Sequence, residues 1–233
     1  MKQLLEGSQA VARAVAACRP QVVAAYPITP QTHIVEALAE LVATGQLDAE
    51  CLNVESEFAA ASVLLGATAA GSRAYSATSS QGLLLMTEVL YNIAGLRLPV
   101  VMTCANRAVS APLNIWNDHQ DVMAVRDSGW IQLFASDNQN AADLHPQAYR
   151  LAEQLRLPVI VNVDGFILTH AFEPVEVPDQ DRVDRFLPAP SLRLLDPDTP
   201  RSVGMMAEPD KFLEARFAQH HAMMAALIAI PEV

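Results

Sequence analysis

Several features that identify common classes of chemistry are scarce or missing in this chain of 233 residues. The three cysteines, Cys18, Cys51 and Cys104, lie far apart and form no CxxC pair. The sequence therefore predicts neither a disulfide framework nor a cysteine-ligated iron–sulfur site. The six histidines show no HExxH or similar spacing, so no metal ligands are predicted. GxGxxG and GxxxxGK(S/T) are also absent, which disfavours a stand-alone nucleotide-binding module.

Positive charge is scarce as well, with 15 Lys and Arg against 26 Asp and Glu and a formal net charge of -11. This balance argues against a nucleic-acid groove and against a face that binds anionic membranes, because both need clustered Lys and Arg. The sequence contains neither a leader-like segment nor an apolar run of about 18 residues, so a cytoplasmic protein with no membrane partner is expected.

The overall composition is unusually apolar for a free-standing monomer. Hydrophobic residues make up 52% of the chain and charged residues 18%. Considerable surface is therefore expected to be covered by partner chains in an oligomer or a complex.

Short β-type runs alternate with helical patterns up to about residue 165. The strand candidates are residues 21–26, 51–54, 73–78, 98–105, 130–135 and 157–163, and helical patterns follow at 30–45, 56–71, 81–95 and 141–155. This alternation predicts an α/β fold, a doubly wound and mostly parallel sheet with helices on both faces. In such sheets the chemistry is expected beyond the carboxyl ends of the strands.

The alternation ends before the last part of the chain. Residues 173–200 are rich in proline and show little periodicity, so this segment is expected to wrap over the surface rather than add to the core. A final helix is predicted from about residue 210 to 227. The expected organisation is an α/β domain at 1–170, with 171–233 forming a wrapping segment and C-terminal helix of the same domain.

Thr29 stands where an apolar run ends, in the segment AAYPITPQT at residues 24–32. Because Thr29 directly precedes Pro30, a favoured first helical residue, the pattern favours Thr29 as a helix N-cap. A functional interpretation is compatible with the cap, since a hydroxyl beside the free N–H groups of a helix N-terminus binds carboxylates.

Two acids, Glu55 and Glu57, lie at a predicted strand-to-helix turn in NVESEFAAAS. Acidic residues in the first turn of a helix interact favourably with the helix dipole, so their presence there does not require a catalytic or binding role. The helix that follows is almost wholly apolar, however, so one of the two carboxylates is expected to point into an enclosed space and share a proton with a ligand nitrogen. The sequence does not choose between Glu55 and Glu57.

Arg107 follows a very apolar strand in TCANRAVSAP. The pattern is compatible with an arginine that is solvated at the surface and contributes little to the stability of the fold. It is equally compatible with a planar guanidinium held at the end of the sheet, where it suits a small carboxylate.

The segment NDHQD at residues 117–121 groups two acids with a histidine. Asp118, His119 and Asp121 are too close in sequence to converge on one ion without further ligands. The segment therefore favours a polar loop network over a metal site.

Several segments, taken together, form a specific pattern. They are AAYPITPQT, NVESEFAAAS, ATSSQGLLLMTEVLYNIAG, RLPVVMTCANRAVSAPLNIWNDHQD, RDSGWIQLF and VDGFILTH. In this order and spacing they resemble the first domain of the 2-oxoacid:ferredoxin oxidoreductases, most of all the α subunits of pyruvate:ferredoxin oxidoreductases. The resemblance covers most of residues 5–225 and implies the pyrimidine-binding-type domain of a thiamine diphosphate enzyme.

The resemblance also implies roles for individual residues. Thr29 aligns with the family threonine near the substrate carboxylate, and Arg107 with the arginine that pairs with that carboxylate. Glu57 aligns with the glutamate that contacts the aminopyrimidine ring of thiamine. Tyr26 and Pro27, in the same motif as Thr29, are expected to line the cofactor site.

The implied reaction is the oxidative decarboxylation of pyruvate, or the reverse synthesis. Coenzyme A is the co-substrate, acetyl-CoA and carbon dioxide are the products, and ferredoxin receives the electrons. Alternatives are the same chemistry on phenylglyoxylate, oxalate, 2-oxoisovalerate or 2-oxoglutarate, because side chains from several subunits set substrate size. A non-catalytic scaffold subunit that keeps the fold is an alternative of another class.

The resemblance further implies that other chains complete the site. Family members hold the diphosphate and Mg²⁺ mainly on a β-type subunit, and carry iron–sulfur clusters on a ferredoxin-like subunit. With a γ-type subunit these form a complex, expected as a dimer of heteromers, and this chain alone is expected to be inactive. Family α subunits usually continue into a second, smaller α/β domain, so the sequence is expected to be either naturally short or part of a longer chain.

Overall fold

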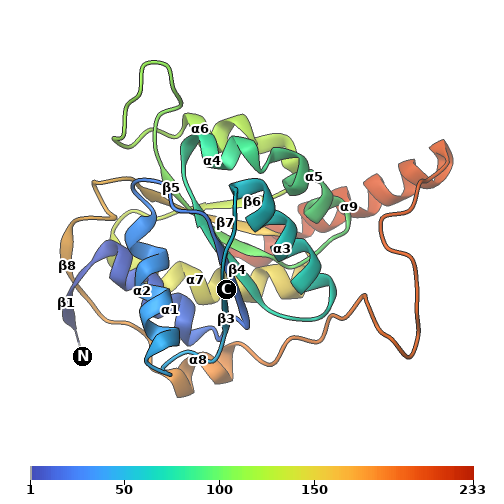
Figure 1. Ribbon diagram of the computed structural model, residues 1–233. Coiled ribbons are helices and arrows are strands. Elements are labelled where there is room, and N and C mark those ends of the chain that lie inside the picture. Colours follow the sequence, from blue (N-terminus) through green and yellow to red (C-terminus); the bar gives the residue numbers. More distant parts are fainter. Residues whose placement is uncertain (1) are drawn as a thin grey trace.

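A parallel β-sheet forms the middle layer of the computed structural model, which describes residues 2–233 (Figure 1). Its six strands run in the order β3-β2-β4-β5-β7-β6, and every neighbouring pair is parallel. The strands are β2 (Val22–Ala25), β3 (Glu50–Asn53), β4 (Ala74–Thr78), β5 (Val101–Asn106), β6 (Ile131–Phe134) and β7 (Val159–Asp164). The predicted α/β fold with a mostly parallel sheet is confirmed.

Helices cover both faces of this sheet because strand side chains alternate between two buried clusters. In β7, Val159 and Val161 belong to one cluster and Ile160 to the other. The first cluster packs against α1 (Gly7–Ala17), α2 (Thr32–Ala43) and α7 (Asn138–Leu155). The second packs against α3 (Glu57–Ala69), α4 (Ser80–Leu85) and α5 (Thr87–Gly95). The two-sided core explains why the central strands are continuous apolar runs.

The structure adds elements that the pattern analysis did not identify. Strand β1 (Gln3–Glu6) pairs antiparallel with β8 (Phe172–Val175). This pairing places the N-terminal residues beside the segment that follows β7. Helix α1 follows β1 directly. The single helix expected at 81–95 is divided into α4 and α5, and a short helix α6 (Gln120–Ala124) follows the long loop after β5.

The expectation that residues 173–200 add nothing to the core is wrong. Val175, Val183 and Leu187 are each at most 4% exposed and belong to the buried clusters. Val183 lies in α8 (Gln180–Phe186), which the proline-rich composition concealed. Prolines interrupt regular backbone hydrogen bonding, but they do not prevent single apolar side chains from packing inward. The final helix is confirmed as α9 (Pro209–Ala229).

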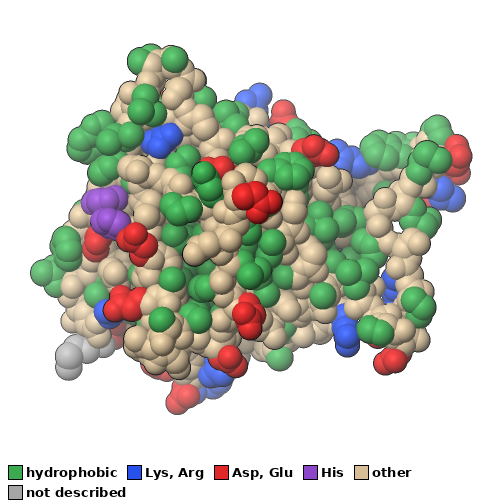
Figure 2. Space-filling model, viewed as in Figure 1, with side chains coloured by type: hydrophobic (Ala, Val, Ile, Leu, Met, Phe, Trp, Pro, Cys, Tyr) green, Lys and Arg blue, Asp and Glu red, His purple; other side chains and the backbone are tan. Residues whose placement is uncertain are grey.

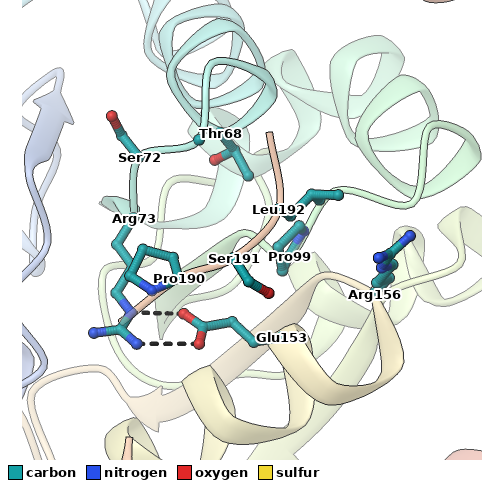
Figure 3. Close-up of a pocket in the computed structure, with 10 residues that line it drawn as sticks. Thr68, Ser72, Arg73, Pro99, Glu153, Arg156, Pro190, Ser191 and Leu192 are labelled. Carbon is teal, nitrogen blue, oxygen red and sulfur yellow. Dashed lines mark hydrogen bonds and ion pairs between the residues drawn. The ribbon is translucent and has the colours of Figure 1, made fainter. Parts of the chain in front are cut away.

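Arg73 connects the proline-rich segment to the domain and also forms a partly buried ion pair with Glu153 (Figure 3). The Arg73 guanidinium donates to both carboxylate oxygens of Glu153 at 2.6 and 3.0 Å and also to the carbonyl of Pro188. The neighbouring cavity, lined in part by Pro190 and Leu192, measures about 30 Å³. A space of this size holds about one water molecule, so this region anchors the segment and is too small for a substrate.

None of the helices within residues 2–233 combines the length and the apolar character that a bilayer crossing requires.

Candidate functional site

The predicted site residues all follow strands of the parallel sheet. Tyr26, Pro27 and Thr29 follow β2, Glu57 follows β3, and Arg107 follows β5. Because parallel strands place their carboxyl ends at one edge of the sheet, the fold brings these residues to the same edge.

Glu57 is the first residue of α3, and the local sequence explains its position. The preceding Ser56 is the N-cap, whose side-chain oxygen accepts a hydrogen bond from the backbone N–H of Ala59 at 3.2 Å. The Glu57 side chain turns inward and is 7% exposed, whereas Glu55 is exposed. The structure therefore answers the question that the sequence left open between these two acids.

The Glu57 carboxylate lies in a close-fitting polar cradle. A Cβ atom built on Gly82 would lie 2.6 Å from Glu57 Oε1 and 2.6 Å from Thr78 Oγ1. Among residues 2–233, the Thr78 hydroxyl is buried without a hydrogen-bond partner. Within the same residues, the Glu57 carboxylate has no hydrogen-bond or ion-pair partner. Buried polar groups are normally paired, so this arrangement points to a ligand that supplies the missing partner.

Replacing Gly82 by alanine is expected to destabilise the fold by about 1–3 kcal/mol, because the new methyl group overlaps Glu57 and Thr78. Gly66, on the exposed side of α3, is the matched control, since a Cβ there meets no atom within 4 Å. Gly66→Ala is expected to stabilise by about 0.5–1 kcal/mol through helix propensity. Urea unfolding of both variants measures the difference. Equal stabilisation by the two substitutions would show that the cradle at Gly82 is not tightly packed.

The N-cap predicted at Thr29 is wrong. Helix α2 begins at Thr32 with Gln31 as its N-cap, and the Gln31 side chain makes no capping hydrogen bond. A turn from Ile28 to Gln31, closed by a backbone hydrogen bond of 2.9 Å, delays the start of the helix. The Thr29 side chain is exposed, and its carbonyl accepts a hydrogen bond from Arg107 Nη1 at 2.6 Å. The structure thus joins Thr29 to Arg107 through the Thr29 backbone.

Tyr26 and Pro27 begin the same turn, and both are exposed at the edge of the sheet. The Tyr26 carbonyl accepts a hydrogen bond from Gln31 Nε2 at 2.9 Å, which ties the turn to the start of α2. The Tyr26 ring is 39% exposed, so it is available to a ligand or a neighbouring chain.

Arg107 is a buried residue rather than a solvated surface arginine, being 6% exposed. Its guanidinium donates to the Thr29 carbonyl and to Gln81 Oε1, both at 2.6 Å. Burial lowers the pKa of the Arg107 guanidinium from its ordinary value, and the Asp121 carboxylate opposes that shift. Arginine keeps its charge in proteins, and among residues 2–233 no acceptor lies within hydrogen-bond distance of the buried Arg107 Nε.

Asp121 organises the site, a role that the sequence analysis missed. It is fully buried and accepts hydrogen bonds from the backbone N–H groups of Ser80 and Arg107, both at 3.0 Å, and from Asn106 Nδ2 at 3.0 Å. It also accepts from the N–H of Val122 at 2.7 Å. One carboxylate thereby joins the residues after β4 and β5 to α6. No spacing rule in the sequence marks this convergence.

The polar loop network predicted for residues 117–121 is confirmed. His119 Nε2 lies 2.9 Å from Asp164 Oδ1, and Asp118 accepts from the N–H of Gln120 at 2.6 Å. These contacts fix the loop after β5 against the end of β7.

Comparison with protein families gives a match over most of the chain. Residues 13–233 match the model of the family described as pyruvate flavodoxin/ferredoxin oxidoreductase, thiamine diphosphate-binding.

Individual relatives agree with this match. The chain is 54% identical over 228 residues to "Pyruvate synthase subunit PorA" of Methanosarcina barkeri, covering 96% of this chain and 57% of the relative. It is 51% identical over 235 residues to the protein of the same name from Methanocaldococcus jannaschii, covering 99% and 60%. The chain thus spans less than two thirds of the length of these relatives.

A solved structure has the same fold. It is the 2-oxoglutarate:ferredoxin oxidoreductase from Magnetococcus marinus, solved with 2-oxoglutarate, coenzyme A and succinyl-CoA bound. The superposition has a TM-score of 0.80 at 19% identity and covers 96% of this chain and 45% of that one. At this identity the likeness establishes the architecture alone.

Proposed function

The chain belongs to the pyruvate flavodoxin/ferredoxin oxidoreductase family, in its thiamine diphosphate-binding domain, and from this premise we propose that it supplies the pyrimidine-binding side of a pyruvate-oxidising enzyme. The proposed reaction converts pyruvate and coenzyme A to acetyl-CoA and carbon dioxide and passes electrons to ferredoxin, or runs in reverse. The assembled enzyme, rather than this chain alone, carries the activity.

The observation that carries this proposal is the buried Glu57 carboxylate without a protein partner. The carboxylate packs closely against Gly82 and Thr78, and no cation lies beside it among the described residues, which supports a bound ligand as its hydrogen-bond partner. Thiamine diphosphate supplies, when bound, an electron sink for breaking the bond between the carboxylate carbon and the 2-oxo carbon. Glu57 would hold a proton shared with a nitrogen of the aminopyrimidine ring, which sets the protonation state of that ring.

Arg107 and Thr29 would orient the substrate. The Arg107 side chain is fixed by the Thr29 carbonyl and by Gln81. These two bonds use two of the five guanidinium N–H groups, and the remaining ones would bind a carboxylate oxygen. The Thr29 hydroxyl is exposed on the same turn. A small 2-oxo acid held in this way would present its carbonyl carbon at a fixed angle, which contributes to rate through positioning.

Partner subunits complete the proposed site. A β-type subunit would hold the diphosphate and Mg²⁺, a ferredoxin-like subunit the iron–sulfur clusters, and a γ-type subunit would complete a dimer of heteromers. Exposed apolar side chains at this edge of the sheet support a covering partner, since Tyr26, Phe58, Leu113 and Trp116 are each at least 39% exposed. Leu113 and Trp116 lie on the loop that projects beyond β5 (Figure 1). Residues 1–170 and 171–233 are proposed to act as one domain in this assembly.

Replacing Arg107 by lysine is expected to lower kcat/KM for pyruvate by about 10- to 100-fold, because a hydrogen bond to a charged group contributes about 1.5–3 kcal/mol. Most of the change should appear in KM, since Arg107 binds the substrate in this account. Steady-state kinetics of the assembled enzyme measure it. Arg126→Lys is the matched control, because Arg126 is 66% exposed, and it should leave the kinetics unchanged.

The function itself is tested by purifying the chain with the subunits that accompany it. The preparation is analysed for thiamine diphosphate and iron, and reduction of a viologen dye is measured with a panel of 2-oxo acids and coenzyme A. Reduction that depends on both pyruvate and coenzyme A is expected. A higher rate with 2-oxoisovalerate, 2-oxoglutarate, phenylglyoxylate or oxalate would correct the substrate. No reduction with any acid in a complete assembly would favour the scaffold subunit.

A further inference from the structure

A second group of polar side chains lies outside the site described above. Glu6 is the last residue of β1, His33 lies in the first turn of α2, and His170 follows the turn after β7. One donor atom from each residue lies within 4.8 Å of the other two. Figure 2 shows histidine and acidic side chains grouped on the face that carries α2 and β8. Because these residues are distant in sequence, no spacing motif reveals them.

The direct contacts within the group bring carboxylate and imidazole donors together. His33 Nδ1 lies 2.7 Å from Glu6 Oε1, and the His33 and His170 rings lie 4.7 Å apart between centroids. The Glu6 side chain is 15% exposed and that of His33 is 47% exposed, so the group is partly enclosed and accessible from one side. An ion pair would explain the contact between Glu6 and His33. It would not explain why the His170 ring also lies against the His33 ring.

The His170 ring is held in place by its own neighbours. Its Nδ1 lies 2.8 Å from the Thr169 hydroxyl oxygen, which also accepts a hydrogen bond from the backbone N–H of Phe166 at 2.8 Å. The Phe166 ring stacks on the His170 ring at 4.5 Å. In the tautomer whose Nδ1–H donates to the Thr169 hydroxyl, Nε2 carries a free lone pair for a metal, which is the usual arrangement of a metal-binding histidine.

The backbone around the group is pre-organised. The N–H of Gly7 donates to the carbonyl of Ala171 at 3.0 Å, and the N–H of Ser8 donates to the carbonyl of Thr169 at 2.9 Å. Glu6 is also in register with Phe172 in the β1–β8 pair. The residues that flank two of the donors are therefore joined by main-chain hydrogen bonds that do not depend on any ion.

We propose that Glu6, His33 and His170 bind one divalent cation of the zinc class. Two imidazole nitrogens and one carboxylate oxygen are donors typical of Zn²⁺, whereas Mg²⁺ and Ca²⁺ prefer oxygen donors alone. Zinc bonds of about 2.0–2.2 Å place tetrahedral donors about 3.4 Å apart, so small side-chain rotations would complete the site. The exposed side of His33 leaves the fourth position to water.

The bound cation would link β1, α2 and the turn after β7. The proposal is independent of the thiamine diphosphate chemistry and would stand if that proposal failed.

The test uses the full chain, purified without a polyhistidine tag, treated with EDTA and dialysed into metal-free buffer. Titration with ZnCl₂ in a calorimeter is expected to give one equivalent of tight binding, and Zn²⁺ should raise the melting temperature until EDTA reverses the shift. CoCl₂ should produce the visible absorption bands of tetrahedral Co²⁺. MgCl₂ should not compete.

The variants Glu6→Gln, His33→Ala and His170→Ala are each expected to weaken Zn²⁺ binding at least about tenfold, because loss of even an outer-shell partner of a metal ligand typically costs about 10- to 100-fold in affinity. His220→Ala, an exposed histidine on α9, is the matched control and should bind like the wild type. Circular dichroism of the metal-free variants shows which remain folded, and Glu6→Gln, which preserves side-chain size, keeps the test valid if a histidine variant unfolds. Absence of Zn²⁺ binding by the wild type, or full binding by the folded variants, would overturn the proposal.

Discussion

Replacing Glu57 by glutamine is expected to lower the turnover of the assembled enzyme by about 10²- to 10⁴-fold, the usual contribution of a positioned acid or base. Glutamine preserves the shape of the side chain within the cradle at Gly82 but removes the negative charge. The amide would not share a proton with a ring nitrogen as a carboxylate does. Dye reduction by the purified complex with pyruvate and coenzyme A measures the loss.

Glu55→Gln is the matched control for this prediction. Glu55 lies two positions earlier, carries the same charge and is exposed, so the same substitution there should leave turnover unchanged. Size-exclusion chromatography should show normal assembly of both variants. Wild-type turnover in the assembled Glu57→Gln enzyme would contradict the assigned role and favour a scaffold.

Replacing Asp121 by alanine is expected to destabilise the protein by about 3–5 kcal/mol, because the change leaves several buried donors without an acceptor. The donors include the backbone N–H groups of Ser80 and Arg107 and the side chain of Asn106. Since Asp121 fixes the backbone of Arg107, substrate binding should weaken as well. Denaturant unfolding monitored by circular dichroism measures the stability, and KM for pyruvate measures the second effect.

Asp127→Ala provides the comparison for Asp121. The Asp127 side chain is 79% exposed, so its removal should change stability by less than about 0.5 kcal/mol. If the two substitutions had equal effects, the network around Asp121 would not be the element that holds the site together.

The fold was predictable because the signals for it are local. The apolar runs that become β5 and β7 are buried on both faces, and each alternates with a helical pattern along the chain. These patterns indicate a parallel sheet without knowledge of any long-range contact. The strand ends then place Glu57 and Arg107 at one edge of the sheet by topology alone.

Features that depend on distant contacts were not predictable from the same patterns. The turn before α2 overrides the favourable Thr29–Pro30 cap signal, and Arg107 accounts for the orientation of the Thr29 carbonyl. Val183 packs into the core from a segment whose prolines suggested a surface location. Asp121 acquires its role only when β4, β5 and α6 meet. In each case, tertiary packing rather than local preference decides the outcome.

The most direct test of the central claim is an experimental structure of the assembled complex with thiamine diphosphate bound. The account predicts a Glu57 carboxylate oxygen within about 2.6–3.2 Å of an aminopyrimidine ring nitrogen, at hydrogen-bonding distance. It also predicts that a neighbouring subunit covers the crevice beside Arg107. A Glu57 side chain that faces open solvent, remote from the coenzyme, would contradict the account.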